Sequence, residues 1–187
     1  MDELIQIIKT FQELDLETEV AIRKYFIPEN FKKGDFVIRE GKICDKIYFI
    51  KSGAVRRFCT EEGMEVTKWI YTDNQFVTSM SSFFEQKPSF ESFQTCENTS
   101  LYSLSYSDEQ LLLEYPLFVK FHINQLRLYL SKINEFHHLF RIMTAQQKYE
   151  FLLESFPQII IKSKLKDIAS LIGVSQETLS RIRASIS

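Results

Sequence analysis

The polar residues at the end of the chain have the types and spacing of a DNA-reading surface. Between Leu165 and Arg183, apolar residues at helical spacing stop at Gly173, and Ser175 is a suitable N-cap for a second helix. Gly173 can adopt the left-handed conformation that ends a helix, and the small side chain of Ala169 lets two helices cross closely. This pattern predicts a helix-turn-helix, with an ordinary helical hairpin as the alternative.

The second of these helices would turn its polar side chains outward. Leu179 and Ile182 would face the first helix, which leaves the following residues outside: Gln176, Glu177, Ser180, Arg181 and Arg183. Glutamine and arginine near a helix N-terminus suit the reading of a major groove. Lysines just before the motif are candidates for phosphate contacts, with a solvated face as the alternative: Lys162, Lys164 and Lys166.

Charge is unevenly distributed along the 187 residues. Residues 141–187 hold seven basic and four acidic side chains, a net charge of +3, whereas residues 1–140 hold 16 basic and 21 acidic ones, a net charge of −5. Hydrophobic residues make up 44% of the chain, which is enough for a substantial core. An acidic front and a basic tail suit a sensor joined to a DNA-binding end.

The residue types disfavour several kinds of site and location. The cysteines, Cys44, Cys59 and Cys96, are odd in number and widely spaced, which predicts free thiols in a reducing cytoplasm. His137 and His138 have no carboxylate or cysteine at ligand spacing, so no metal site is predicted. The N-terminus does not read as a signal peptide, and no apolar stretch of 18 residues occurs, so we expect a cytoplasmic protein without a membrane partner.

Patterning changes from helical to β-rich early in the chain. Apolar residues at helical spacing predict helices over residues 2–26, which Pro28 ends. From Phe31 onward, short β-rich runs are cut by turn residues, including four of the five glycines of the chain: Gly34, Gly41, Gly53 and Gly63. We therefore expect a β-roll or jelly-roll barrel over roughly residues 30–105.

A heptad pattern follows the β-rich segment. Pro116 marks the beginning of a predicted long helix. Seven positions, spaced alternately four and three apart, predict a parallel homodimer: Val119, Ile123, Leu126, Leu130, Ile133, His137 and Phe140. We call these residues the seam. A helix packed on its own barrel is the alternative, and a second apolar stripe is available for that packing: Phe118, Phe121 and Leu128.

One more helix is predicted over residues 141–158. Thr144 is a plausible N-cap, Gln147 completes a capping box, and Pro157 ends the helix. Its apolar side chains would give the helix-turn-helix a small core. The fold class is therefore α+β, with a β-roll or jelly-roll sensor domain and N-terminal helices over 1–115, a dimerisation helix over 116–140 and a small helix-turn-helix domain over 141–187.

These parts, in this order, resemble the Crp–Fnr family of bacterial transcription regulators. FKKGDFVIREG followed by IYFIKSGAVR is similar to the opening strands of the cyclic-nucleotide-binding fold, and the likeness covers roughly residues 10–183. The resemblance implies that Gln176, Glu177 and Arg181 read bases. Backbone-contacting residues would be Ser175, Thr178, Lys164 and Lys166. It implies duplex DNA and a second copy of the chain as partners, with RNA polymerase as a further candidate.

Family members usually continue from the recognition helix into a β-hairpin wing. The sequence given ends at Ser187, four residues after Arg183. The DNA-binding domain is therefore expected without a full wing.

The residues with which cyclic-nucleotide members of this fold hold the phosphate are missing. The family has Gly-Glu and an arginine where this sequence has Thr78, Ser79 and Ser89, and no arginine occurs between Arg57 and Arg127. Because a buried phosphate needs a charged partner, binding of cyclic AMP in the usual way is not expected. The candidate effector-pocket residues are Thr78, Ser79, Ser82, Ser89, Phe90, Ser92 and Asn134.

Three possibilities for the barrel stay open. It could bind an unknown, less charged small-molecule effector through these hydroxyl groups. It could hold no ligand and be filled by phenylalanines: Phe83, Phe84, Phe90 and Phe93. It could also bind a nucleotide through an unmatched set of residues. No cofactor is identified.

The predicted function is that of a homodimeric, DNA-binding transcription regulator of the Crp–Fnr type. An enzyme is not expected, because no Ser/His, Cys/His or paired-carboxylate arrangement is localised to a motif. The alternative is a ligand-binding or interaction module whose DNA-binding end is vestigial. Salt-dependent binding to duplex DNA would distinguish the two.

Overall fold

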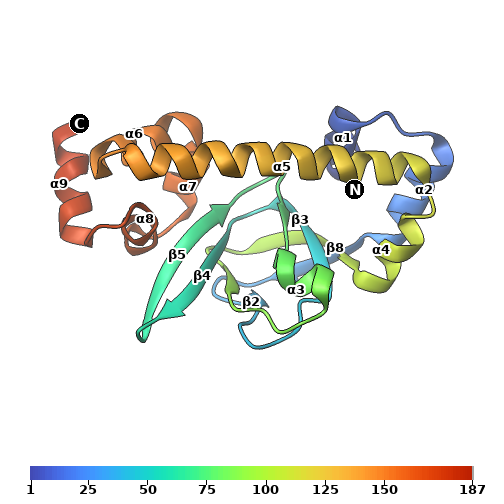
Figure 1. Cartoon of the computed structure of the whole chain (residues 1–187), viewed down its shortest axis with the longest axis horizontal. Coiled ribbons are helices and arrows are strands. Elements are labelled where there is room, and N and C mark those ends of the chain that lie inside the picture. Colours follow the sequence, from blue (N-terminus) through green and yellow to red (C-terminus); the bar gives the residue numbers. More distant parts are fainter. Residues whose placement is uncertain (187) are drawn as a thin grey trace.

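A computed structural model describes residues 1–186 of the chain. Two short helices, α1 (Asp2–Phe11) and α2 (Leu16–Tyr25), lead into a β-sandwich, and a 27-residue helix, α5 (Pro116–Ile142), runs along the molecule (Figure 1). The Asp15 side chain caps α2 by accepting a hydrogen bond from the backbone N–H of Thr18. These elements confirm the helices predicted over 2–26 and the long helix beginning at Pro116.

The barrel consists of two four-stranded antiparallel sheets. One has the strand order β1-β8-β3-β6 and the other β2-β7-β4-β5. The strands are β1 (Ile27–Phe31), β2 (Phe36–Ile38), β3 (Lys46–Ser52), β4 (Val55–Glu61), β5 (Met64–Tyr71), β6 (Phe76–Val77), β7 (Ser92–Thr95) and β8 (Thr99–Ser105). This β-sandwich confirms the barrel predicted over roughly 30–105.

The turn between β3 and β4 requires its glycine. Gly53 has φ +121°, and a Cβ atom placed there would lie 2.8 Å from the Cα of Thr99. No larger residue could keep β4 this close to the start of β8 without a shift of backbone.

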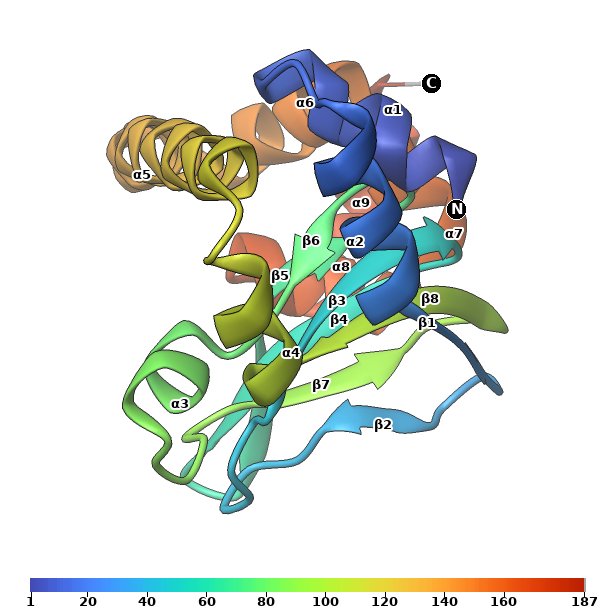
Figure 2. The same ribbon diagram turned by 90° about the vertical axis from the view of Figure 1, so that its right-hand side faces the viewer.

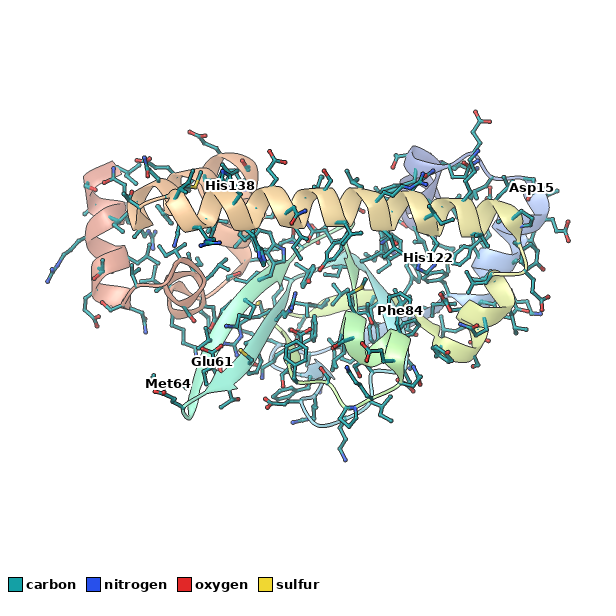
Figure 3. The ribbon with its side chains drawn as sticks, in the orientation of Figure 1. Asp15, Glu61, Met64, Phe84, His122 and His138 are labelled. Carbon is teal, nitrogen blue, oxygen red and sulfur yellow. The ribbon has the colours of Figure 1, made fainter. Side chains whose placement is uncertain are left out.

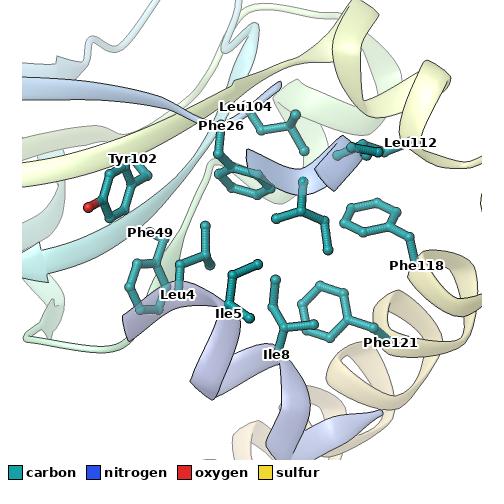
Figure 4. Close-up of a cluster of buried hydrophobic side chains, with 12 residues drawn as sticks. Leu4, Ile5, Ile8, Phe26, Phe49, Tyr102, Leu104, Leu112, Phe118 and Phe121 are labelled. Atoms are coloured by element: carbon teal, nitrogen blue, oxygen red, sulfur yellow. The ribbon is translucent and has the colours of Figure 1, made fainter. Parts of the chain in front are cut away.

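One hydrophobic core joins the N-terminal helices, the sandwich and the first turns of α5. Leu4, Ile5 and Ile8 on α1 meet Phe26 and Phe49 from the barrel side (Figure 4). Phe118 and Phe121, on the second apolar stripe of α5, are buried in the same cluster. α5 therefore packs on its own chain through that stripe. This agrees with the alternative in which the long helix packs on its own barrel. Figure 2, which looks along α5, shows it beside α1 and above the sandwich.

Four helices follow α5. They are α6 (Ala145–Ser155), α7 (Pro157–Lys162), α8 (Leu165–Ile172) and α9 (Gln176–Ile186). The capping box of Thr144 and Gln147 is present at α6. Pro157 does end α6, but it also begins α7, because proline suits the first turn of a helix. Short helices α3 (Met80–Glu85) and α4 (Tyr106–Leu112) complete the fold.

The C-terminal helices share a second core with the barrel. Leu152, Ile168 and Leu179 from the helices pack in one cluster with Ala54 and Ile70 from the sandwich. Within residues 1–186, no helix has the length and apolar character needed to cross a membrane. In the same range, no three histidine, cysteine or acidic side chains gather as metal ligands.

Candidate functional site

The turn between α8 and α9 holds α9 with its polar face outward. Gly173 ends α8 with φ +80°, and the backbone N–H of Val174 donates to the carbonyl of Ala169 over 3.0 Å. The Ser175 hydroxyl accepts a hydrogen bond from the backbone N–H of Thr178 over 3.2 Å, as predicted for the N-cap. Leu179 is fully buried, so the opposite face of α9 is exposed.

Nine of the ten residues predicted to contact DNA are exposed, and Lys162 is half-buried. The nine exposed residues are Lys164, Lys166, Ser175, Gln176, Glu177, Thr178, Ser180, Arg181 and Arg183. Its own backbone N–H and the hydroxyl of Ser175 lower the pKa of Glu177, which keeps this side chain a hydrogen-bond acceptor at the N-terminus of α9. A carboxylate there can accept from the N4 amino group of cytosine.

Lys162 does not behave as predicted for a phosphate contact. Its Nζ lies 2.7 Å from both carboxylate oxygens of Asp73 and 3.4 Å from Oε1 of Glu97. The side chain therefore ties α7 to the barrel. Because two carboxylates lie beside the ammonium group, the local net charge is negative, which does not favour a phosphate.

Buried polar contacts fix α8 against β4 and β5. Arg56 donates to Asp167 Oδ1 over 3.0 Å and to Glu65 Oε2 over 2.6 Å, and the side chains of Arg56 and Asp167 are only 6% and 7% exposed. The backbone N–H of Thr67 donates to the hydroxyl of Ser170 over 2.9 Å. The Arg56–Asp167 pair was not predicted from the sequence, although an acid within the apolar face of a helix was a visible signal.

The seam is only partly exposed. Ile123 and Leu130 are 44% and 61% exposed, and His137 is exposed as well. Phe140 instead packs against Phe136 and Phe151 of its own chain. The half-buried Phe140 ring therefore packs on the C-terminal core, and its place in a dimer surface stays a prediction.

The hydroxyl groups predicted to line an effector pocket have partners inside the barrel. The Ser89 hydroxyl donates to the Ser79 hydroxyl over 2.9 Å, and Ser82 donates to the carbonyl of Lys87 over 2.5 Å. Thr78 donates to a carbonyl of β3, and Ser92 accepts from a backbone N–H. These bonds fasten the α3 region to the sandwich.

The remaining predicted pocket residues are spread apart. Phe90 is 60% exposed, and Asn134 is exposed on α5. Phe83 and Phe93 are fully buried in the sandwich, whereas Phe84 and Phe90 are exposed. Of the four phenylalanines proposed to fill the barrel, two therefore lie in its interior and two do not.

A half-buried arginine in this region forms an ion pair with a buried acid. Arg57 on β4 donates through Nε to Oε2 of Glu91, which is 3% exposed. Burial opposes the charge of Arg57, but Tyr71 and Glu91 together raise its pKa, so the side chain stays a cation. A protein carboxylate thus satisfies the guanidinium, where an anionic ligand could otherwise do so. Glu91 was not among the predicted site residues.

Two cavities lie beneath α5. The smaller, of about 50 Å³, lies among β6, α3 and α5, and of the predicted effector residues only Thr78 lines it. The larger, of about 300 Å³, lies between α5 and the β4–β5 face and extends to Phe156 at the junction of α6 and α7. Ile133 and His137, predicted as seam residues, line this larger cavity.

Comparison with known proteins identifies the type of barrel. Residues 28–115 match the family model described as the cyclic nucleotide-binding domain. No curated protein matches the sequence.

Solved bacterial regulators share the fold of nearly the whole chain. The Catabolite Activator Protein of Thermus thermophilus is 20% identical, with a TM-score of 0.59 over 94% of this chain and 85% of that one. FixK2 from Bradyrhizobium japonicum is 16% identical, with a TM-score of 0.71 over 86% and 84%. CLP of Xanthomonas campestris, described as a c-di-GMP responsive global regulator, is 17% identical, with a TM-score of 0.68 over 92% and 91%. At these identities the matches establish the fold alone, and they agree with the Crp–Fnr resemblance in the cyclic-nucleotide-binding-like sandwich and the long helix.

Proposed function

We propose that this chain is a homodimeric transcription regulator that binds duplex DNA through α9. The observation that carries the proposal is the division of α9 into a buried apolar side, around Leu179, and an exposed side with Gln176 and Arg181. A helix held by its inner face and polar outside can enter a major groove. Its N-terminus also carries the partial positive charge that favours a phosphate.

Each residue type on this face has a matching chemistry. Arg181 suits guanine O6 and N7, Gln176 suits adenine, and Glu177 suits cytosine. Lys164 and Lys166 are exposed just before and within the first turn of α8 and would contact the phosphate backbone. The basic charge of residues 141–187 supports non-specific attraction to DNA.

Pairing of two chains would use the exposed part of the seam. Ile123 and Leu130 are one heptad apart and both exposed, so they can meet the same residues of a second α5. A two-fold dimer would present two copies of α9, as a site with two half-sites requires. Regulation would then act by changing how the two copies of α9 are spaced.

DNA binding is tested with a fluorescein-labelled 30-base-pair duplex of mixed sequence, by anisotropy in 50 to 200 mM KCl. We expect affinity to fall steeply with salt, and Arg181→Ala to weaken binding about tenfold, as loss of one base or phosphate contact does. Arg39→Ala, which removes an exposed arginine of the barrel, is the matched control and should bind like the wild type. Salt-independent or absent binding, or equal losses in both variants, would favour the vestigial alternative.

A further inference from the structure

The exposed face of α5 repeats every seven residues and includes a histidine. Ile123 and Leu130 are 44% and 61% exposed, and His137, seven residues further on, is exposed as well. These three residues occupy the same position of successive heptads, and in a parallel pair of helices each such residue lies beside its own copy. Pairing of two chains through α5 would therefore bring two His137 side chains together.

The charged residues of α5 leave His137 without an acid beside it. Four residues of the helix are basic and one is acidic: Lys120, Arg127, Lys132 and Arg141 against Glu135. Arg141 follows His137 by four residues, on the same face, and is exposed. Glu135 lies on the opposite side of the helix, because two residues correspond to a rotation of about 200°. Among residues 1–186, His137 makes no hydrogen bond or ion pair.

The β4–β5 face adds positive charge near this histidine. His137 lines the larger cavity beneath α5, and the charged side chains of residues 1–186 that line it as well are basic: Arg57, Lys68 and Lys132. Glu91 is paired with Arg57 and Glu61 with Lys68, so these two acids already have cations of their own.

Helix α6, which packs on the end of α5, also supplies a cation. Nζ of Lys148 lies 5.4 Å from the centroid of the Phe140 ring, three residues beyond His137. The acids of α6 are Glu150 and the exposed Glu154, and within residues 1–186 neither forms an ion pair with α5. A proton on His137 would therefore add to a surface that is already positive.

We infer that two His137 side chains meet across the paired α5 helices and make dimerisation sensitive to pH. Neutral imidazoles can lie side by side, with an N–H of one donating to a nitrogen of the other, whereas two imidazolium groups repel each other. Arg141 of each chain adds to that repulsion. Separate chains then take up protons more readily than the pair does, so a falling pH favours separate chains.

This switch rests on the pairing of chains in the proposed function and adds what regulates it. A protein that separates in acid presents single copies of α9, which bind a site with two half-sites less tightly. The regulator would therefore release such a site when its surroundings become acidic.

The test measures the dimer dissociation constant of the full chain by sedimentation velocity at pH 7.5 and 5.5 in 150 mM KCl, without DNA. For the wild type we expect the constant to rise about tenfold on acidification, because a charge on one histidine disfavours a charge on the other. His137→Leu should show no rise. His137→Lys, which carries its charge at both pH values, should dimerise weakly at both.

His138→Leu is the matched control. His138 is the next residue, is exposed and lies outside the seam, so this variant should keep the rise of the wild type. His122 lies about 22 Å earlier along the helix axis and is common to all these proteins. Far-UV circular dichroism at both pH values checks that each variant stays folded.

Two kinds of result would count against the switch. A wild-type dimer whose dissociation constant is the same at both pH values, or a rise that persists in His137→Leu, would overturn the inference and leave pairing through α5 intact. A wild type that is monomeric at both pH values, with His137→Leu monomeric too, would overturn the pairing itself and the switch with it. Since no DNA is present, failure of DNA binding would leave the sedimentation result standing.

Discussion

Arg56 and Asp167 form an ion pair between the barrel and α8 from which water is nearly excluded. The two side chains are 6% and 7% exposed and 3.0 Å apart, and Glu65 and Gln94 give the guanidinium further partners. Removing one member of such a pair leaves a buried charge without compensation. The pair therefore makes the docking of the C-terminal helices sensitive to a single residue.

Asp167→Ala should lower the free energy of unfolding by about 3 kcal/mol in urea denaturation, since Arg56 loses its only buried carboxylate partner among the described residues and keeps the exposed Glu65 and the amide of Gln94. Glu61→Ala removes a partner of similar type from Lys68, but both side chains of that pair are at least 40% exposed, and the loss should be below about 1 kcal/mol. Equal losses in the two variants would show that the buried pair contributes no more than a surface one.

His122 on α5 is largely covered, lies beside the buried Glu109 of α4 and is near Phe84 (Figure 3). Nδ1 of His122 and Oε1 of Glu109 are 3.6 Å apart. Burial lowers the pKa of His122 below its ordinary value of 6.5 and raises the pKa of Glu109. The unfolded chain therefore takes up a proton at His122 at a higher pH than the folded chain does, so this histidine makes stability fall as the pH falls through about 6.5. Glu109 acts in the opposite direction, because its raised pKa favours the folded state as the pH falls.

When the pH falls from 7.5 to 5.5, we expect the free energy of unfolding of His122→Gln to decrease less than that of the wild type, because the variant lacks the histidine. The contribution of Glu109 is common to both proteins. Urea unfolding at the two pH values measures this difference. His138→Gln, a change at an exposed position of the same helix, is the control and should keep the pH dependence of the wild type. If His122→Gln also kept it, the histidine would not be held neutral by burial.

The roles of individual residues were predicted correctly only where a short stretch of sequence determines them. The cap residues Thr144, Gln147 and Ser175 and the turn glycine Gly173 act within a few residues of themselves, and all four are where the pattern placed them. The ion pair of Lys162 was not predicted, because its partner, Asp73, is 89 residues away. Glu91 was missed for the same reason, since Arg57 is 34 residues earlier in the chain.

At the scale of elements, α5 serves two surfaces at once. Phe118 and Phe121 bury one stripe in the N-terminal core, whereas Ile123 and Leu130 stay exposed on another. The heptad pattern alone could not tell which of its members would be covered by the same chain. Phe140 shows this limit, because its neighbours on α6 are fixed by tertiary packing.

Leu130→Glu should convert a dimer to a monomer, because it places two carboxylates at one contact between paired α5 helices. Sedimentation velocity at micromolar concentration measures the change. Ile142→Glu alters an aliphatic side chain of similar exposure, 67% against 61%, that lies outside the seam, and it should leave the assembly intact. A monomeric wild type, or dissociation of both variants, would argue against pairing through the seam.

At the scale of the whole molecule, the order of the parts could be predicted and their contacts could not. Glycine spacing and strand patterning predicted the β-sandwich, and the family model and solved structures support that fold. The large cavity, the Arg56–Asp167 pair and the Lys162–Asp73 pair each join segments that are distant in sequence. Such contacts depend on how the C-terminal helices dock on β4 and β5, which no local pattern encodes.

The central claim is that two chains read DNA together through α9. Its most direct test is selection of bound duplexes from a random pool by the full chain, followed by sequencing. We predict an enriched two-fold symmetric motif whose half-sites lie about one helical turn apart, and no enrichment with Gln176→Ala combined with Arg181→Ala. Failure of the wild type to enrich any sequence, or enrichment that survives the double variant, would contradict the claim.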